Sequence, residues 1–225
     1  REILQLCNMA VREAAETGQP TVVRLGVLVT IPAALVAAVV AACRRSPTAL
    51  PLELVEGTEH ELANRLRDGS IDFALTLDRG ENPGLPASPV FEEGYALALP
   101  ASHPLADRPV LGAEDVMHEP MIVRQRCEVL SETSRHFTDR NVRPRFAFRS
   151  ASDERVLALV GAGLGLTVMP ESYTHPDVAR VPLAGFDLRR RLVLQRSPAT
   201  AGLSAEDHVR PLAEAVEAVF GKQFG

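Results

Sequence analysis

The stretch VVRLGVLVTIPAALVAAVVAACRR, residues 22–45, decides the fold of this chain. Its first eight residues are rich in valine and leucine, which is typical of a buried β-strand. Pro32 suits the first turn of a helix, and Arg44 with Arg45 would face the negative end of the helix dipole. The stretch therefore predicts a strand, a short loop and a helix over residues 32–45.

The same alternation of strand and helix continues to residue 77. Leu52–Glu56 and Ile71–Leu77 are predicted strands. Thr58 and Glu61 have the S/T-x-x-E form of a capping box, which opens a helix that ends before Gly69. Three apolar strands joined by two helices form a βαβαβ unit. Its right-handed crossovers imply a parallel sheet with helices on both faces.

A second series of strands and helices follows a turn-rich segment at residues 80–89. We expect strands near residues 95–99, 121–123, 145–148, 164–169 and 192–195, and helices near 128–139, 153–162 and 205–220. The sequence thus predicts an α/β protein of two lobes. Residues 21–96 and 193–225 belong to the first lobe and residues 97–192 to the second.

Composition excludes several classes of protein. The 225 residues carry a formal net charge of -5, which argues against a broad surface that grips phosphate backbones. The three cysteines lie far apart without CxxC spacing, so neither a zinc site nor a disulfide framework is indicated. Leu25–Cys43 lacks charged residues, but its glycine, proline and many alanines disfavour a membrane span. We expect a soluble cytoplasmic domain without membrane contact.

Catalytic motifs are not recognisable in the sequence. His60 and Glu61 start like the metalloprotease H-E-x-x-H, but Asn64 stands where the second zinc ligand must lie. The glycines at 161, 163 and 165 lack dinucleotide-loop spacing, and they indicate a helix stop followed by tight entry into a strand. We therefore expect no catalytic residue, no metal, no cofactor and no enzyme activity.

Several segments in order carry a resemblance to a known family. They are VRLGV at 23–27, LELVEGT at 52–58, RLRDGSIDFAL at 65–75, HPLA at 103–106 and LALVGAGLGLTVMP at 157–170. Together they resemble the effector-binding domain of LysR-type transcriptional regulators. The resemblance implies a type 2 periplasmic-binding-protein-like fold, in which two Rossmann-like lobes are joined by two crossover strands and an effector binds between the lobes.

The resemblance also implies how the intact protein is organised. Residues 1–20 resemble the end of a linker helix, and the family's winged helix-turn-helix DNA-binding domain is absent from this fragment. We expect DNA contact only through that missing domain. We also expect a homodimer through the helix at 32–45, whose apolar residues exceed what one sheet can cover, and a tetramer of the intact protein. An extracytoplasmic solute-binding protein and an enzyme on the same fold remain alternatives.

The candidate site combines strand ends with one arginine-rich loop. Ligands gather outside the carboxyl ends of parallel strands, where the following helices offer N–H groups and a positive dipole. An arginine could hold a carboxylate there through two charge-assisted hydrogen bonds. We predict a small anionic effector bound by Thr30, Ile31, Thr58, Thr76, Arg124, Gln125, Arg126, Cys127 and Thr167. In the plainer alternative Thr58 is only a helix cap and the loop arginines are solvated.

Overall fold

Two compact units make up the part of the chain that the computed structural model describes, residues 22–45, 51–80, 84–200 and 212–220. Unit 1 contains the described residues up to Glu92 and again from Arg190, and unit 2 contains Glu93–Arg189. The chain therefore passes between the units twice, at residues 92/93 and 189/190. Both passages lie a few residues before the positions expected from the sequence.

Unit 1 is built on a five-stranded sheet with the strand order β2-β1-β3-β10-β4. Its elements are β1 (Val23–Leu28), α2 (Ala33–Arg45), β2 (Leu52–Gly57), α3 (Glu59–Arg67), β3 (Phe73–Leu77), β4 (Ala87–Glu93), β10 (Arg190–Arg196) and the short 3-10 helix η2 (Pro198–Thr200). β1 pairs in parallel with both β2 and β3, and β10 pairs antiparallel with β3. The predicted βαβαβ unit is confirmed.

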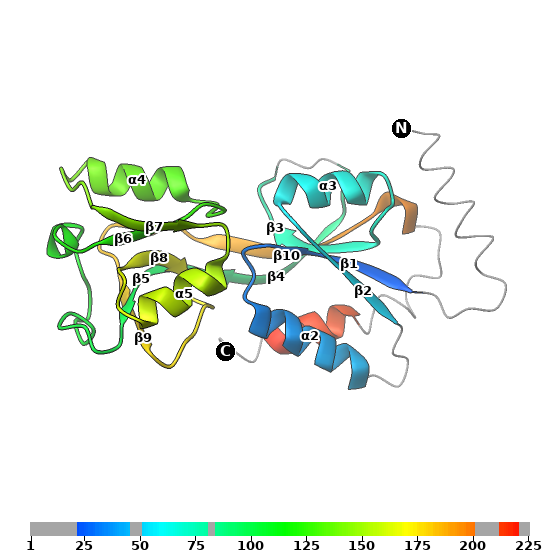
Figure 1. Ribbon diagram of the computed structural model, residues 1–225. Coiled ribbons are helices and arrows are strands. Elements are labelled where there is room, and N and C mark those ends of the chain that lie inside the picture. Colours follow the sequence, from blue (N-terminus) through cyan, green and yellow to red (C-terminus); the bar gives the residue numbers. More distant parts are fainter. Residues whose placement is uncertain (1–21, 46–50, 81–83, 201–211, 221–225) are drawn as a thin grey trace. The chain divides into compact units, whose positions relative to one another are not determined.

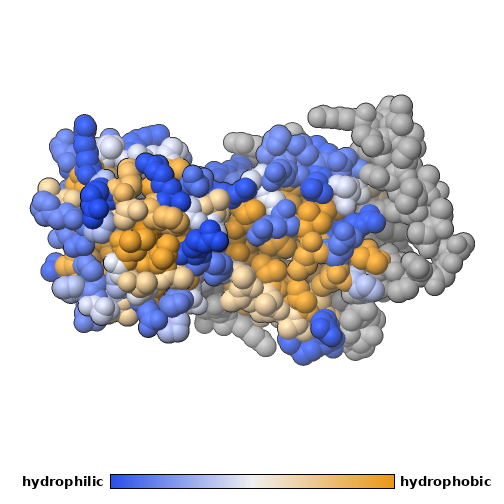
Figure 2. Space-filling view, viewed as in Figure 1, coloured by the Kyte–Doolittle hydropathy of each residue, from blue (hydrophilic) through white to orange (hydrophobic). Residues whose placement is uncertain are grey.

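Helices cover both faces of the unit 1 sheet. α3 lies on one face, and α2 lies on the other together with the helix at residues 212–220 (Figure 1). α2 buries Leu35, Val39 and Cys43, which recur every four residues, against this sheet. Its remaining surface is largely apolar (Figure 2) and includes the exposed alanines 33, 34, 37 and 41. Residues 205–211 of the predicted last helix lie outside the described residues.

Unit 2 contains two small sheets. Its elements are β5 (Tyr95–Pro100), the 3-10 helix η1 (Glu114–Val116), β6 (Met121–Arg124), α4 (Leu130–Thr138), β7 (Phe146–Ser150), α5 (Asp153–Gly161), β8 (Thr167–Pro170) and β9 (Val178–Pro182). β5 pairs antiparallel with β8 and β9, while β6 and β7 pair in parallel. A bridge between Met121 and Leu166 links the two sheets.

The turn between α5 and β8 depends on two glycines. Gly163 has φ +82, a left-handed conformation that ends the helix at low cost. A Cβ atom on Gly165 would lie 2.5 Å from the carbonyl oxygen of Pro120. That carbonyl accepts a hydrogen bond from the backbone N–H of Leu166 at 2.8 Å. The predicted helix stop and tight entry into a strand are confirmed.

No helix within the described ranges combines the length and the hydropathy needed to cross a bilayer. The apolar stretch Leu25–Cys43 is divided between β1, a turn and the 13-residue α2.

Candidate functional site

In unit 1 the predicted site residues follow the parallel strands β1 and β2 or lie within β3. Thr30 and Ile31 are buried in the turn between β1 and α2. Arg190 of β10 donates hydrogen bonds from Nη1 to the carbonyl oxygen of Thr30 at 3.0 Å and to its Oγ1 at 3.3 Å. Arg190, which is itself only 4% exposed, therefore fixes the backbone after β1.

Thr58 is the N-cap of α3. Its Oγ1 accepts from the backbone N–H of Glu61 at 3.4 Å and donates to Oε2 of the same residue at 2.8 Å. The Glu61 carboxylate accepts in turn from the backbone N–H of Thr58 at 2.8 Å. The capping box predicted from the sequence is confirmed, and the Thr58 hydroxyl is engaged within it.

Thr76 lies in β3 opposite Val193 of β10 and is 3% exposed. Its Oγ1 has no hydrogen-bond partner among the residues that the structure describes. A buried hydroxyl without a partner is destabilising.

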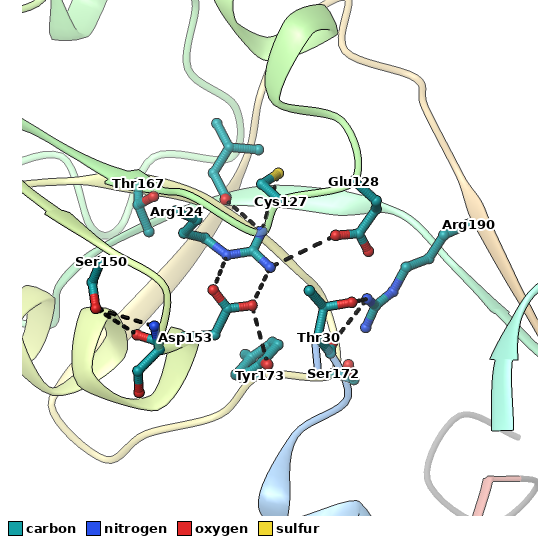
Figure 3. A network of polar contacts seen from close by, with 12 residues as sticks. Thr30, Arg124, Cys127, Glu128, Ser150, Asp153, Thr167, Ser172, Tyr173 and Arg190 are labelled. Carbon is teal, nitrogen blue, oxygen red and sulfur yellow. Dashed lines mark hydrogen bonds and ion pairs between the residues drawn. The ribbon is translucent and has the colours of Figure 1, made fainter. Parts of the chain in front are cut away.

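Arg124, the last residue of β6, is buried rather than placed on an exposed loop. Its Nε donates to Oδ1 of Asp153 at 2.9 Å, and its Nη2 donates to Oδ2 of the same carboxylate. Its Nη1 also donates to the carbonyl oxygen of Val168 at 3.2 Å. The hydroxyl of Tyr173 donates to Asp153 Oδ2 at 3.3 Å, so Asp153 lies between the arginine and the tyrosine (Figure 3).

This geometry changes the role available to Arg124. The Nε–Nη2 edge of the guanidinium, which could have held an effector carboxylate through two hydrogen bonds, is occupied by the chain's own Asp153, and Nη1 donates to Val168. Burial alone would lower the pKa of the Arg124 guanidinium, but the hydrogen bonds and charge of Asp153 outweigh it and raise that pKa. Glu128 adds a further ion pair, with its Oε2 3.9 Å from Nη2 of Arg124. Arg124 is thus a permanently charged anchor.

The three residues after Arg124 have different environments. Gln125 and Arg126 are exposed, and Cys127 is partly buried. The Cys127 sulfur lies 3.5 Å from Nη1 of Arg124. Burial raises the pKa of the Cys127 thiol, and the positive charge of Arg124 only partly opposes that rise. The thiol therefore stays protonated at neutral pH, the form that reacts poorly as a nucleophile.

Thr167, in β8, donates from Oγ1 to the carbonyl oxygen of Ile122 at 2.8 Å. It thereby connects β8 to β6 beside Arg124 and Cys127. These three predicted residues line one pocket of about 410 Å³, which lies wholly within unit 2. This volume falls within the range of about 300–1,000 Å³ that small-molecule sites occupy.

Four further residues of these networks were not predicted: Glu128, Asp153, Tyr173 and Arg190. Asp153 follows the α5 N-cap Ser152, so its position in the sequence indicates a helix start and hides its second role with Arg124. Arg190 lies within a run of three arginines, 189–191, and only the strand pairing shows which of them is buried. The sequence around Tyr173 contains no motif that indicates its contact with Asp153.

Two α/β units connected by two passages of the chain define the class of type 2 periplasmic-binding-protein-like folds. A solved structure of HinK, a LysR family transcriptional regulator from Pseudomonas aeruginosa, matches this fold with a TM-score of 0.75. The match covers 99% of this chain and 78% of HinK at 20% sequence identity. The family model described as the LysR substrate binding domain matches residues 16–217, and the chain belongs to this family.

Curated relatives agree with this assignment. The HTH-type transcriptional regulator TtuA of Agrobacterium vitis is 30% identical over 159 residues, which are 69% of this chain and 52% of TtuA. A probable hydrogen peroxide-inducible genes activator of Mycobacterium avium is 29% identical over 159 residues, 70% of this chain and 51% of its own. The chain spans about half the length of these relatives. The family and the fold class predicted from the sequence are confirmed.

Proposed function

We propose that this chain is the effector-sensing domain of a LysR-type transcriptional regulator. The intact protein would bind DNA through a separate domain, act in the cytoplasm and change transcription when a small molecule binds. The match to the LysR substrate binding domain over residues 16–217 carries this proposal. The relatives are named as regulators of transcription or gene activation, which supports this proposal over a solute-binding protein or an enzyme.

The effector we propose is a small organic anion. In unit 1, Thr30 and Thr58 follow parallel strands at the starts of α2 and α3, where helix dipoles favour negative charge. In unit 2, Arg126 is exposed and directly follows the anchored Arg124. Because Asp153 occupies the Arg124 fork, Arg126 is the better candidate for direct contact and Arg124 positions the loop. That residues of both units share one effector stays a prediction.

A metabolite screen by thermal shift tests this proposal. A ligand at about 100 times its Kd should add roughly 2.7 kcal/mol to the free energy of unfolding. Calorimetric titration of the best ligand should then show weaker binding to Arg126→Ala and Thr58→Ala, while Arg180→Ala, an exposed arginine of β9, binds like wild type. An uncharged best ligand, or unchanged affinity in both site variants, would contradict the assignment.

A response to peroxide is a second function that one relative's name raises. The raised pKa of the Cys127 thiol disfavours this function, because a protonated thiol reacts poorly. Cys43, the other described thiol, belongs to unit 1, so the described residues of unit 2 offer no second thiol with which Cys127 could form a disulfide. We expect brief treatment with equimolar hydrogen peroxide to leave the mass of the Cys127 peptide unchanged. Rapid stoichiometric oxidation of Cys127 would instead favour the redox function.

We further propose that the protein forms a homodimer through α2. The helix buries one side against its own sheet and exposes small apolar residues on the other. A second copy of the same helix offers a matching apolar surface. The test is the oligomeric state of a charged α2 variant, described in the Discussion.

A further inference from the structure

One face of α4 lines the unit 2 pocket. The lining residues of this helix are Leu130, Thr133, Ser134, Phe137 and Thr138, which recur at helical spacing. On a core helix such a face would carry large apolar side chains throughout, whereas three of these five are small hydroxyl residues. The helix is therefore held over β6 and β7 with space beneath it.

Two of the three hydroxyl groups on this face are bonded within the helix. Thr133 Oγ1 donates to the carbonyl oxygen of Val129 at 2.8 Å, and Thr138 Oγ1 donates to that of Ser134 at 3.0 Å. Both hydroxyls thus bond to their own helix and leave their methyl groups for other contacts. The opposite wall is formed by apolar side chains that include Met121 and Val168, both buried in the unit 2 core.

The pocket reaches the surface through apolar side chains. Phe146 and Leu130, which both line it, are 52% and 39% exposed. On the face of unit 2 that Figure 2 shows, apolar side chains gather below α4, around β6, β8 and α5, with hydrophilic side chains around them. Exposure of large apolar groups beside a cavity is unfavourable in water, so it indicates a surface that binds something apolar.

The charged side chains that line the pocket are all basic. Arg143 and Arg149 line it, and no lining residue is acidic. Neither arginine forms an ion pair with a carboxylate among the described residues. The guanidinium of Arg149 lies 4.9 Å from the centre of the Phe146 ring, which holds it at the pocket. Arg124 also lines the pocket, but Asp153 already neutralises it.

We propose that this pocket binds an amphipathic organic anion, whose apolar body lies beneath α4 and whose carboxylate or sulfonate is held by Arg143 and Arg149. This proposal depends on the proposed function in one respect: both take the domain to bind a small-molecule ligand. It places a complete ligand site inside unit 2, with no contribution from unit 1. Because Arg124, Cys127 and Thr167 line the same pocket, occupancy would bear directly on the loop at residues 125–127.

The probes are 2-naphthoate and its uncharged analogue 2-naphthalenemethanol, titrated into the 225-residue chain by calorimetry. We expect 2-naphthoate to bind at least about tenfold more tightly, because only the carboxylate can form charge-assisted hydrogen bonds with the arginines. The double variant Arg143→Gln/Arg149→Gln should remove that preference and leave the alcohol's affinity unchanged. Arg145→Gln, an exposed arginine between the two that does not line the pocket, should behave like wild type.

A second pair of variants tests the cavity itself. Ser134→Phe should fill the space beneath α4 and abolish binding of both probes, whereas Ser131→Phe, on the same helix but outside the pocket, should not. If Ser134→Phe does not fold by circular dichroism, the arginine variants decide alone. Equal binding of 2-naphthoate by wild type and the double arginine variant, or no binding at millimolar concentration, overturns the proposal. A metabolite that still stabilises the chain in that case leaves the sensing function intact.

Discussion

At the scale of single residues, the Arg124–Asp153 pair shows how a buried charge depends on its partner. Both side chains are almost completely buried, at 1% and 2% exposure. Transfer of an isolated charge into such surroundings costs several kcal/mol, and an oppositely charged neighbour with good hydrogen-bond geometry offsets that cost. The pair thus specifies how β6 and α5 pack, whatever its net contribution to stability.

Removal of one partner should therefore be worse than removal of both. We expect Asp153→Leu to lower the free energy of unfolding by about 3–5 kcal/mol, since Arg124 is left without its main counter-charge. The double variant Arg124→Met/Asp153→Leu should recover much of that loss. Urea unfolding of the two variants and wild type measures both values. A single variant as stable as wild type would contradict this account of the pair.

His136 should make stability depend on pH. Its side chain is 7% exposed, and its Nε2 has no hydrogen-bond partner in the described part of the chain. Burial, and then the charge of Arg140, lower the pKa of His136, although Glu114 and Asp139 oppose the shift. The unfolded chain therefore binds a proton first, near the usual histidine value of about 6.5.

As pH falls from about that value to the folded pKa, the free energy of unfolding should decrease, and below the folded pKa this residue causes no further loss. Above about pH 7.5 both states are neutral at this residue and it contributes no slope. Urea unfolding at pH 8 and pH 5.5 should show a larger loss for wild type than for His136→Gln. The same loss in both proteins would mean that other groups cause the pH dependence.

Residues were predictable where their partners are near in sequence. Thr58 and Glu61 are three positions apart, so the sequence alone predicts the capping box. Arg124 and Asp153 are separated by 29 positions, and only the parallel pairing of β6 with β7 brings β6 near the start of α5. The sequence therefore left open whether an arginine of this segment points inward, and the structure shows that Arg124 is buried.

At the scale of elements, the edge strands β4 and β9 were not predicted, whereas the central strands β1 and β3 were. β1 and β3 are apolar runs buried on both faces, and their pattern was clear. β4 contains Pro89 and is mostly exposed, which is typical of an edge strand, and the sequence indicated only turns across its first residues. β9 was missed because five residues with partial exposure carry little pattern.

The contact between β6 and β8 should be sensitive to one methyl group. Gly165→Ala places a Cβ atom 2.5 Å from the carbonyl oxygen of Pro120, so the two backbones must separate. We expect a loss of about 1–3 kcal/mol in the free energy of unfolding. Gly112→Ala is the control, since its new methyl group would meet the end of the flexible Glu114 side chain. Equal stability of both variants would show that the strands can move apart freely.

At the scale of the whole molecule, the separation into units follows from the order of elements. The βαβαβ signal, a turn-rich segment and a second series of strands predict two lobes from the sequence alone. Whether Thr30 and Thr58 of unit 1 act with Arg126 of unit 2 on one effector depends on an arrangement that local patterns do not encode. The pocket beneath α4 was also not predicted, because periodicity reports which face is inside but not how well that face fills the space.

We predict that two chains form a dimer through α2. The exposed alanines 33, 37 and 41 recur every four residues on the side of the helix away from its own sheet. Small residues let two helices approach closely, and a self-complementary patch favours a two-fold dimer.

Ala37→Glu places a charge in that patch, while glutamate keeps nearly the helix propensity of alanine. Sedimentation at high micromolar concentration should therefore show a dimer for wild type and a monomer for Ala37→Glu. Because Ala37 is exposed within its own chain, unfolding at low concentration should change by no more than about 0.5 kcal/mol. Ala158→Glu, an equally exposed alanine of α5, should remain dimeric. A wild-type chain that is strictly monomeric, or an Ala37→Glu variant that dimerises as before, would rule out α2 as the interface.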